Sequence, residues 1–213
     1  AVIGSTGSGK STLINLIPRY YDVTKGSVKV DGVDVRDMTQ KELRDKLGYV
    51  PQKGVLFSGT IDSNIRYGKP EITDAQVKEA AEVAQATEFI DTKPEKYESP
   101  VSQGGTNVSG GQKQRLSIAR AIAKDPEIFI FDDSFSALDF KTDSQLRKAL
   151  KEYTKDATTV IVAQRISTIL GADQIIVLDD GHMAGIGTHK ELMANCEVYQ
   201  QIARSQLSEE ELA

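Results

Sequence analysis

Short apolar runs of strand length recur along the chain and alternate with segments of helical periodicity. The runs are AVI at 1–3, LGYV at 47–50, EIFIFD at 127–132, TTVIVA at 158–163 and QIIVLDD at 174–180. Helical patterns follow three of them, at 10–17, 139–154 and 165–170. Strands that are joined through helices usually run parallel in one sheet. The alternation therefore predicts an α/β fold with a mainly parallel sheet and helices on both faces.

Two other stretches are typical of β-hairpins. VKVDGVDV at 28–35 and LDDGHMAG at 178–185 each place Asp-Gly between short β-prone runs. Asp-Gly supplies the left-handed turn residues that a tight hairpin needs. We expect both hairpins to be antiparallel additions at the periphery of the sheet.

Helix starts are marked by a repeated capping pattern. Thr39, Thr73, Ser109 and Thr188 are each followed three residues later by Glu or Gln. In this arrangement the two side chains satisfy each other's backbone N–H groups. Residues 61–119 lack strong strand runs, so we expect a helical subdomain there, inserted into a core formed by 1–60 and 120–213. Together these parts make one domain over 1–213.

The composition excludes several classes of function. The chain has 213 residues and a net charge of −5, without the Lys and Arg cluster of a nucleic-acid binder. No apolar run approaches the roughly 18–20 residues that cross a bilayer, so no direct membrane insertion is expected. Cys196 is the only cysteine, which indicates a reducing compartment. Residues 1–3 read as the end of a strand, so we expect a fragment of a longer chain whose first strands are missing.

The stretch GSTGSGKS at 4–11 matches the GxxxxGK[ST] pattern of a phosphate-binding loop. Its glycines let the backbone approach a phosphate closely, and its N–H groups and the following helix start supply partial positive charge. Lys10 is expected to reach the β- and γ-phosphates, and Ser11 to bind Mg²⁺. The predicted nucleotide contacts of this loop are Ser5, Thr6, Gly7, Ser8, Gly9, Lys10, Ser11 and Thr12.

A second glycine-rich helix start follows in NVSGGQKQRLSIARA, from Asn107. Ser109 is the expected cap, and Gly110 and Gly111 permit an anion to approach the helix. One chain cannot easily direct two such helix starts to the same γ-phosphate if they belong to different subdomains. A second copy of the domain could.

With these motifs in order, the sequence resembles the ATP-binding domain of ABC transporters of the exporter type. The resemblance covers nearly the whole chain: the loop at 4–11, VPQKGVLFSGTIDSNI around Gln52, VSGGQ at 108–112, IFIFDD at 128–133, SALD at 136–139 and a switch position at Gln164. It implies a P-loop NTPase core of the ABC type. It also implies two such domains that sandwich ATP and Mg²⁺ head to tail, and a transmembrane domain as partner at the cytoplasmic face of the cell membrane.

The resemblance assigns further roles residue by residue. Gln52 and Asp132 would join Ser11 around Mg²⁺, and Gln52 would couple the site to the transmembrane partner. Ser109, Gly110, Gly111 and Gln112 would contact the partner domain's nucleotide, and Asp139 would cross the dimer interface. Taken alone, Gln52 after Pro51 could be a turn residue and Asp139 a helix cap.

The sequence departs from the family pattern near the expected γ-phosphate. Asp133 stands where the family has a catalytic Glu, Gln164 where it has a His, and Gln103 where exporters have an acidic residue. The aromatic residue that stacks on adenine would lie upstream of Ala1. Asp is shorter than Glu by about 1.5 Å, and a misplacement of about 1 Å can cost on the order of a hundredfold in rate. Gln cannot carry a proton as His does.

Asp133 and Gln164 therefore predict a site that binds ATP and turns it over slowly. The chain would then be the degenerate half of a heterodimeric exporter, whose signature at 109–112 completes the partner's hydrolytic site. Two alternatives stay open: a homodimeric slow ATPase in which both substitutions are tolerated drift, and a soluble ABC ATPase or nucleotide sensor without transport.

Overall fold

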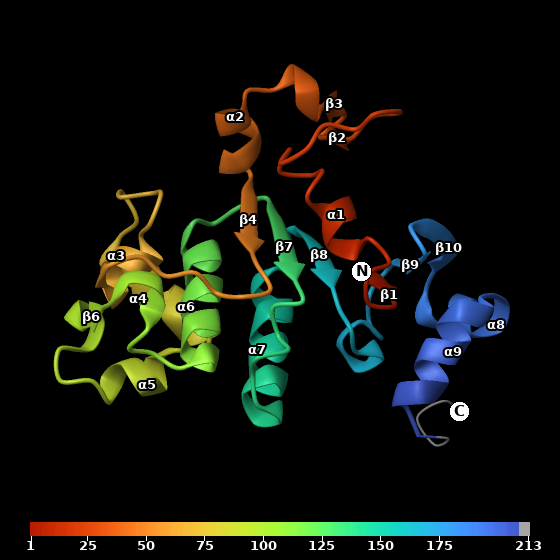
Figure 1. The fold of residues 1–213 in the computed structure, drawn as a ribbon. Coiled ribbons are helices and arrows are strands. Elements are labelled where there is room, and N and C mark those ends of the chain that lie inside the picture. The colour runs from red at the N-terminus through yellow and green to blue at the C-terminus, as the bar shows by residue number, and fades with distance from the viewer. Residues whose placement is uncertain (209–213) are drawn as a thin grey trace. The chain divides into compact units, whose positions relative to one another are not determined.

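The computed structural model describes residues 1–208, and the chain forms two compact units. The first unit comprises 1–43 and the chain from Val160 on, and the second comprises Arg44–Thr159 (Figure 1). Helix α2 (Gln40–Asp45) and strand β8 (Thr158–Val162) lie where the chain passes from one unit to the other. The predicted division into a 61–119 subdomain and a surrounding core stays a prediction.

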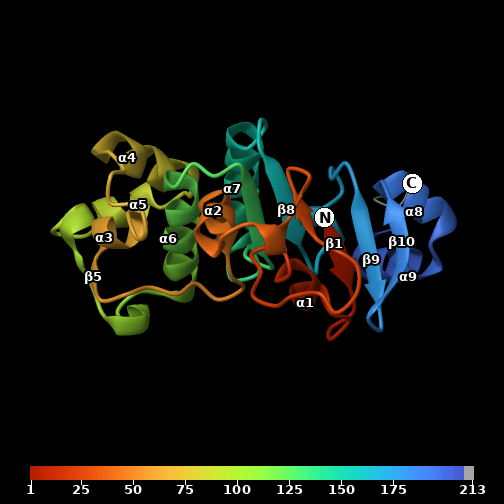
Figure 2. The ribbon, with the colours of Figure 1, turned by 90° about the horizontal axis from the view of Figure 1, so that it is seen from above.

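Parallel pairing organises the strands of the first unit. Strand β1 (Val2–Gly4) pairs in parallel with β8 and with β9 (Ile175–Asp179). Strand β10 (His182–Gly187) pairs antiparallel with β9. Helix α8 (His189–Asn195) packs against β10, and helix α9 (Glu197–Gln206) packs against β9, as the blue elements of Figure 2 show. The remaining elements are α1 (Lys10–Ile14), β2 (Lys29–Val30), β3 (Val33–Asp34), η1 (Val35–Asp37) and the 3₁₀ turn η4 (Ile166–Thr168).

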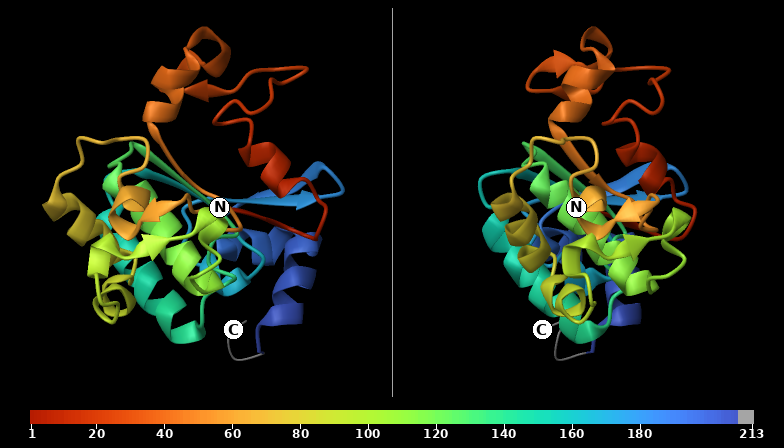
Figure 3. Two further views of the ribbon diagram at one scale, coloured as in Figure 1. Left: turned by 60° about the vertical axis from the view of Figure 1, so that its left-hand side comes forward. Right: turned by 90° about the vertical axis from the view of Figure 1, so that its left-hand side faces the viewer.

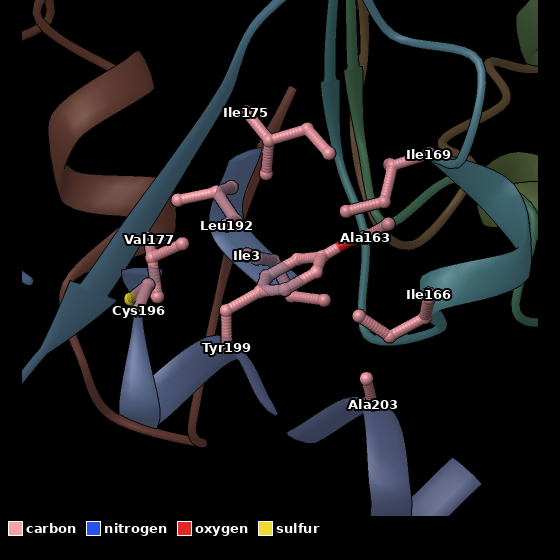
Figure 4. Packing of buried hydrophobic residues seen from close by; sticks show 10 residues of the cluster. All are labelled: Ile3, Ala163, Ile166, Ile169, Ile175, Val177, Leu192, Cys196, Tyr199 and Ala203. Carbon is pink, nitrogen blue, oxygen red and sulfur yellow. The ribbon is translucent and has the colours of Figure 1, made fainter. Parts of the chain in front are cut away.

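Tyr199 occupies the centre of the apolar core of this unit. Its side chain is fully buried among Ile3, Ala163 and Leu192 (Figure 4). The Tyr199 hydroxyl lies 2.8 Å from Nδ1 of His189, so its polar end has a partner. Burial raises the pKa of Tyr199 to about 12, and the phenol stays neutral at physiological pH. The core thereby fixes α9 against β1 and the segment after β8.

The second unit combines one parallel strand pair with a group of helices. Strand β4 (Leu47–Val50) pairs in parallel with β7 (Ile128–Asp132). Helix α6 (Gly110–Ala123) buries Leu116, Ile118 and Ile122 and packs against α3, α4 and β4, and the yellow and green helices gather around it in Figure 3. The other elements are β5 (Gly59–Thr60), α3 (Ile61–Ile65), α4 (Asp74–Val83), α5 (Thr87–Asp91), η2 (Lys96–Glu98), β6 (Pro100–Val101), η3 (Gln103–Gly105) and α7 (Phe140–Tyr153).

Most of the local predictions are confirmed. All five apolar runs contain strands, the long helix at 139–154 is α7, and both Asp-Gly stretches form antiparallel hairpins. The four Thr or Ser caps exchange the expected pairs of hydrogen bonds with Glu42, Gln76, Gln112 and Glu191. Over the described residues, no helix combines the length and apolar character required to cross a bilayer.

The position of the first hairpin requires a correction. Strands β2 and β3 form a two-stranded sheet of their own within the first unit, and do not add to the sheet that contains β1. The reason is local, because the Asp34 carboxylate accepts a hydrogen bond from the Arg36 N–H and starts η1 immediately after β3. The strand therefore ends after two residues.

A capping substitution tests how far α8 depends on its first turn. Replacing Thr188 by Ala removes the hydroxyl that accepts the Glu191 N–H, and leaves that N–H without its cap. We expect the free energy of unfolding to fall by about 1 kcal/mol in urea denaturation. The exposed Thr24, for comparison, caps no helix, and Thr24→Ala should change stability by less than about 0.5 kcal/mol. Equal losses in the two variants would contradict this assignment.

Candidate nucleotide site

The glycine-rich loop joins β1 to α1 within the first unit. A Cβ atom on Gly4 would lie 2.2 Å from the carbonyl oxygen of Leu178 and 2.6 Å from Oγ of Ser8, so only glycine fits there. Gly7 and Gly9 have φ angles of 82° and 95°, which lie in the left-handed region that favours glycine. The three glycines thus set the path of the loop. Gly4 is required because a side chain there would collide, and Gly7 and Gly9 because of their positive φ angles.

Lys10 and Ser8 give this loop the chemistry of a phosphate site. Nζ of Lys10 donates to the carbonyl oxygens of Gly4 at 3.0 Å and Ser5 at 2.7 Å, so its ammonium lies over the loop. Oγ of Ser8 is buried and has no hydrogen-bond partner among the described residues. A buried hydroxyl without a partner, in the same loop as an ammonium group, fits a bound phosphate oxygen. Ser5, Thr6, Ser11 and Thr12 are exposed around it.

In the second unit, two carboxylates lie at the end of the buried strand β7. Asp132 and Asp133 are 7% and 8% exposed. The hydroxyl of Tyr49 donates to Oδ2 of Asp132 at 3.3 Å, and Nε2 of Gln52 donates to Oδ2 of Asp133 at 2.9 Å. The structure therefore brings Gln52, Asp132 and Asp133 together, and Tyr49 with them. Sequence analysis missed Tyr49. The feature that could have indicated it is its place in the apolar run LGYV, whose strand pairs in register with β7.

Asp133 has an unusual backbone conformation. Its φ angle is 47°, in the left-handed region, where Asp is several-fold more common than most other residues with a side chain. Two serines hold the turn that it starts: Oγ of Ser136 donates to the Asp133 carbonyl oxygen at 3.0 Å, and Oγ of Ser134 donates to Val50 O at 2.8 Å. The backbone at this position therefore favours Asp by itself, independently of any catalytic requirement.

Gln114 connects the Gln52 loop to helix α6. Its side chain is 1% exposed, its Oε1 accepts from the Gly54 N–H at 2.8 Å, and its Nε2 donates to the Pro51 carbonyl oxygen at 3.0 Å. A buried amide that satisfies backbone groups on both sides of Gln52 holds that loop in place. Sequence analysis missed Gln114, although a polar residue on a buried helix face was visible in the α6 pattern.

The signature motif forms the start of α6. Oγ of Ser109 accepts from the Gln112 N–H at 3.2 Å, and Oε1 of Gln112 accepts from the Ser109 N–H at 3.1 Å. A Cβ atom on Gly110 would meet nothing within 4 Å, and one on Gly111 would come no closer than 3.6 Å to the carbonyl oxygen of Ala137. The helix start is therefore open on its glycine side, which is the form that an anion site requires.

Asp139 caps helix α7 and lies near a partly buried arginine. Its carboxylate accepts from the Thr142 N–H at 3.0 Å, and this bond, the Thr142 hydroxyl and the charge of Arg115 lower the pKa of Asp139. Arg115 itself lies over the Phe89 ring at 4.7 Å and donates to the Gln85 carbonyl oxygen. Asp139 is therefore a helix cap, and its role across a dimer interface stays a prediction.

Gln164 lies in the first unit, two residues beyond the end of β8, and is exposed. Its carbonyl oxygen accepts from Nε2 of Gln206 at 2.8 Å, at the end of α9. Gln103 belongs to η3 of the second unit, and its Oε1 accepts weakly from the Ser58 N–H at 3.4 Å. Sequence analysis missed Gln206, because nothing in the pattern of α9 separates it from the other glutamines of that helix.

Comparison with known proteins shows the family of the chain. Residues 1–136 match the protein family described as ABC transporter. The chain belongs to the ABC transporter family. ATP with Mg²⁺ is the ligand pair of this family, and the phosphate loop and the carboxylates of β7 are chemically suited to them. The α/β ABC ATPase fold expected from the sequence is confirmed.

Similar proteins include bacterial members of this family. The chain is 50% identical over 209 residues to an uncharacterized ABC transporter ATP-binding protein of Mycobacterium tuberculosis (strain ATCC 25618 / H37Rv), covering 97% of this chain and 36% of that protein. It is 48% identical over 202 residues to a putative multidrug export ATP-binding/permease protein of Staphylococcus aureus (strain NCTC 8325 / PS 47), covering 95% and 35%. A solved bacterial Atm1-family ABC exporter with ATP bound superposes with a TM-score of 0.94 at 39% identity, covering 98% and 37%. The chain thus spans about a third of the length of these relatives.

The tight contact at Gly4 predicts that this ABC loop tolerates no side chain at its first position. Gly4→Ala should lower the free energy of unfolding by at least about 1–3 kcal/mol, because its Cβ atom would collide with the Leu178 carbonyl. The dissociation constant of ATP should rise with it. Gly171, where a Cβ atom would meet nothing within 4 Å, provides the matched control Gly171→Ala. A Gly4→Ala variant as stable as this control would show the contact to be wrong.

Replacing Gln114 by Met tests whether it supports the Gln52 loop. Met has a similar length but leaves the Gly54 N–H and the Pro51 carbonyl oxygen without the Gln114 amide. We expect a loss of about 1–3 kcal/mol in the free energy of unfolding and faster amide exchange at Gly54. The exposed Gln145 on α7 gives the control Gln145→Met, which should change neither quantity.

Proposed function

We propose that the chain is the nucleotide-binding domain of an ABC exporter, which binds ATP-Mg²⁺ and pairs head to tail with a second ATP-binding domain. A transmembrane domain at the cytoplasmic face of the cell membrane would be its other partner. The order of the motifs, the exporter named among the solved structures and the multidrug export protein among the relatives support this function. ATP binding and hydrolysis would drive export through the transmembrane partner.

The residue roles follow the motifs. Ser5 to Thr12 hold the phosphates of ATP, and Ser11, Gln52 and Asp132 hold Mg²⁺. Ser109, Gly110, Gly111 and Gln112 contact the nucleotide of the partner domain, together with Asp139. The open glycines at the start of α6 support the contact with the partner's nucleotide. The buried hydroxyl of Ser8, which has no hydrogen-bond partner among the described residues, supports the phosphate site.

We further propose that this domain's own site is catalytically degenerate, and one observation carries this step. The Asp133 carboxylate is buried and accepts the Gln52 amide at 2.9 Å, so the carboxylate at the catalytic position is engaged by a neighbour. A general base must reach the water whose proton it takes, and a short side chain held by a hydrogen bond reaches less far than Glu. Gln164 cannot exchange a proton in its place.

In this view the domain is one half of a heterodimer. It retains ATP at its own loop, while its signature motif completes the hydrolytic site of a partner with Glu and His at the corresponding positions. A homodimeric slow ATPase is the second candidate. The left-handed φ of 47° at Asp133 favours it, because Asp at that position then has a backbone reason and needs no partner to compensate.

Restoring the family residues tests the degenerate site. Asp133→Glu combined with Gln164→His should raise the steady-state ATP hydrolysis rate of the purified protein by at least about tenfold, since a positioned base contributes 10² to 10⁴. Adding Lys10→Ala to this double variant should abolish the gain and show that it arises at this loop.

Two results would contradict the proposal. One is rapid ATP hydrolysis by self-paired copies of the unmodified protein that Lys10→Ala removes, which would favour the homodimeric ATPase. The other is an unchanged rate in the double variant with ATP still bound tightly, which would place the limitation outside Asp133 and Gln164. Asp133→Asn serves as a control, because Asn tolerates the same left-handed backbone but cannot act as a base.

A further inference from the structure

Gln206 bridges two backbone groups of the segment that carries the switch position. Its Nε2 donates to the carbonyl oxygen of Gln164 at 2.8 Å, and its Oε1 accepts from the Ile166 N–H at 2.8 Å. The contacts join the last residue of α9 to a segment 40 and 42 residues earlier in the chain. One side-chain amide therefore spans Arg165 on both sides.

The orientation of this amide is determined by its partners. A carbonyl oxygen can only accept and a backbone N–H can only donate, so the Gln206 oxygen must face Ile166 and its nitrogen must face Gln164. A carbonyl and an N–H on either side of one residue are the groups that a neighbouring parallel strand would pair with. Gln206 thus continues sheet-like pairing beyond the end of β8 at Val162.

Helix α9 is anchored in the apolar core of the first unit. Ala203 and Tyr199, about one and two turns before Gln206 on α9, are fully buried in the core with Ala163 and Ile166 (Figure 4). The last sheet-like bond before the bridge runs from the Ala163 N–H to the Val2 carbonyl oxygen at 3.1 Å. The bridge therefore covers the two residues between that bond and the turn η4.

We propose that Gln206 is a positioning residue, which fixes the backbone from which Gln164 projects and thereby sets the contact of this domain with the γ-phosphate of ATP. The inference rests on the proposed function, in which Gln164 takes the position of the family's His near the γ-phosphate. Its consequence is that α9, which carries none of the family motifs, controls how well the site distinguishes ATP from ADP.

Two variants of Gln206 separate the two hydrogen bonds of the bridge, and a third variant is the control. Gln206→Met removes both hydrogen bonds at nearly constant length. Gln206→Glu keeps an acceptor for the Ile166 N–H but loses the donor to Gln164. Gln201→Met is the matched control, because Gln201 lies on the same helix, is exposed, and bonds only to Glu197 of its own helix in the described structure.

The first measurement is hydrogen–deuterium exchange of the Ile166 amide in the purified protein without nucleotide. Gln206→Met should speed this exchange roughly three- to tenfold, the effect of losing one typical hydrogen bond. Gln206→Glu and Gln201→Met should leave it near the unmodified rate. Unchanged exchange in Gln206→Met would overturn the bridge itself.

The second measurement is the ratio of the dissociation constants of ADP-Mg²⁺ and ATP-Mg²⁺. Both Gln206 variants should lower this ratio at least about threefold, because only ATP offers the γ-phosphate, while Gln201→Met should not. A merely structural role would lower the melting temperature and leave the ratio unchanged, and that result would overturn the positioning role alone. If the unmodified protein does not favour ATP over ADP, the proposed ATP-retaining function fails, and the positioning role with it, even where exchange supports the bridge.

Discussion

Buried parallel strands impose the constraint on which the rest of this structure depends. Their backbone groups pair with neighbouring strands and their side chains enter the core, so chemistry is confined to the loops at their carboxyl ends. In the first unit this places the phosphate loop directly after β1 and Gln164 shortly after β8. In the second it places Asp132 and Asp133 at the end of β7. The polar residues proposed for this domain's own Mg²⁺ and γ-phosphate lie in the loops that follow these strands.

The sequence predicted the strands of the five apolar runs and of the two hairpins, four capped helix starts and the position of each motif, because these depend on local patterns. It did not predict the short strands β5 and β6. It did not predict Tyr49, Gln114 or Gln206, whose partners lie 83, 60 or 63, and 40 or 42 residues away. It also missed the cap at Thr60, where Ser63 takes the place usually held by Glu or Gln. The short first hairpin was misplaced because its end is set by a hydrogen bond between Asp34 and Arg36.

Each of the missed glutamines acts on backbone rather than on a nucleotide. Gln114 satisfies the chain on both sides of Gln52, and Gln206 does the same around Arg165. A side-chain amide suits this task, since it carries the donor and acceptor of a peptide group without belonging to the main chain. The residues that hold the two motif loops are thus chemically alike, although they occur on helices with no pattern in common.

The contact at Gly4 has a consequence for how this region can diverge. The atom that excludes a side chain there is the main-chain oxygen of Leu178, and not its isobutyl group. Every amino acid carries that oxygen, so no replacement at 178 can make room for a larger residue at position 4. Compensating pairs of mutations should therefore be absent between these two sites, while position 178 remains free to exchange one aliphatic residue for another.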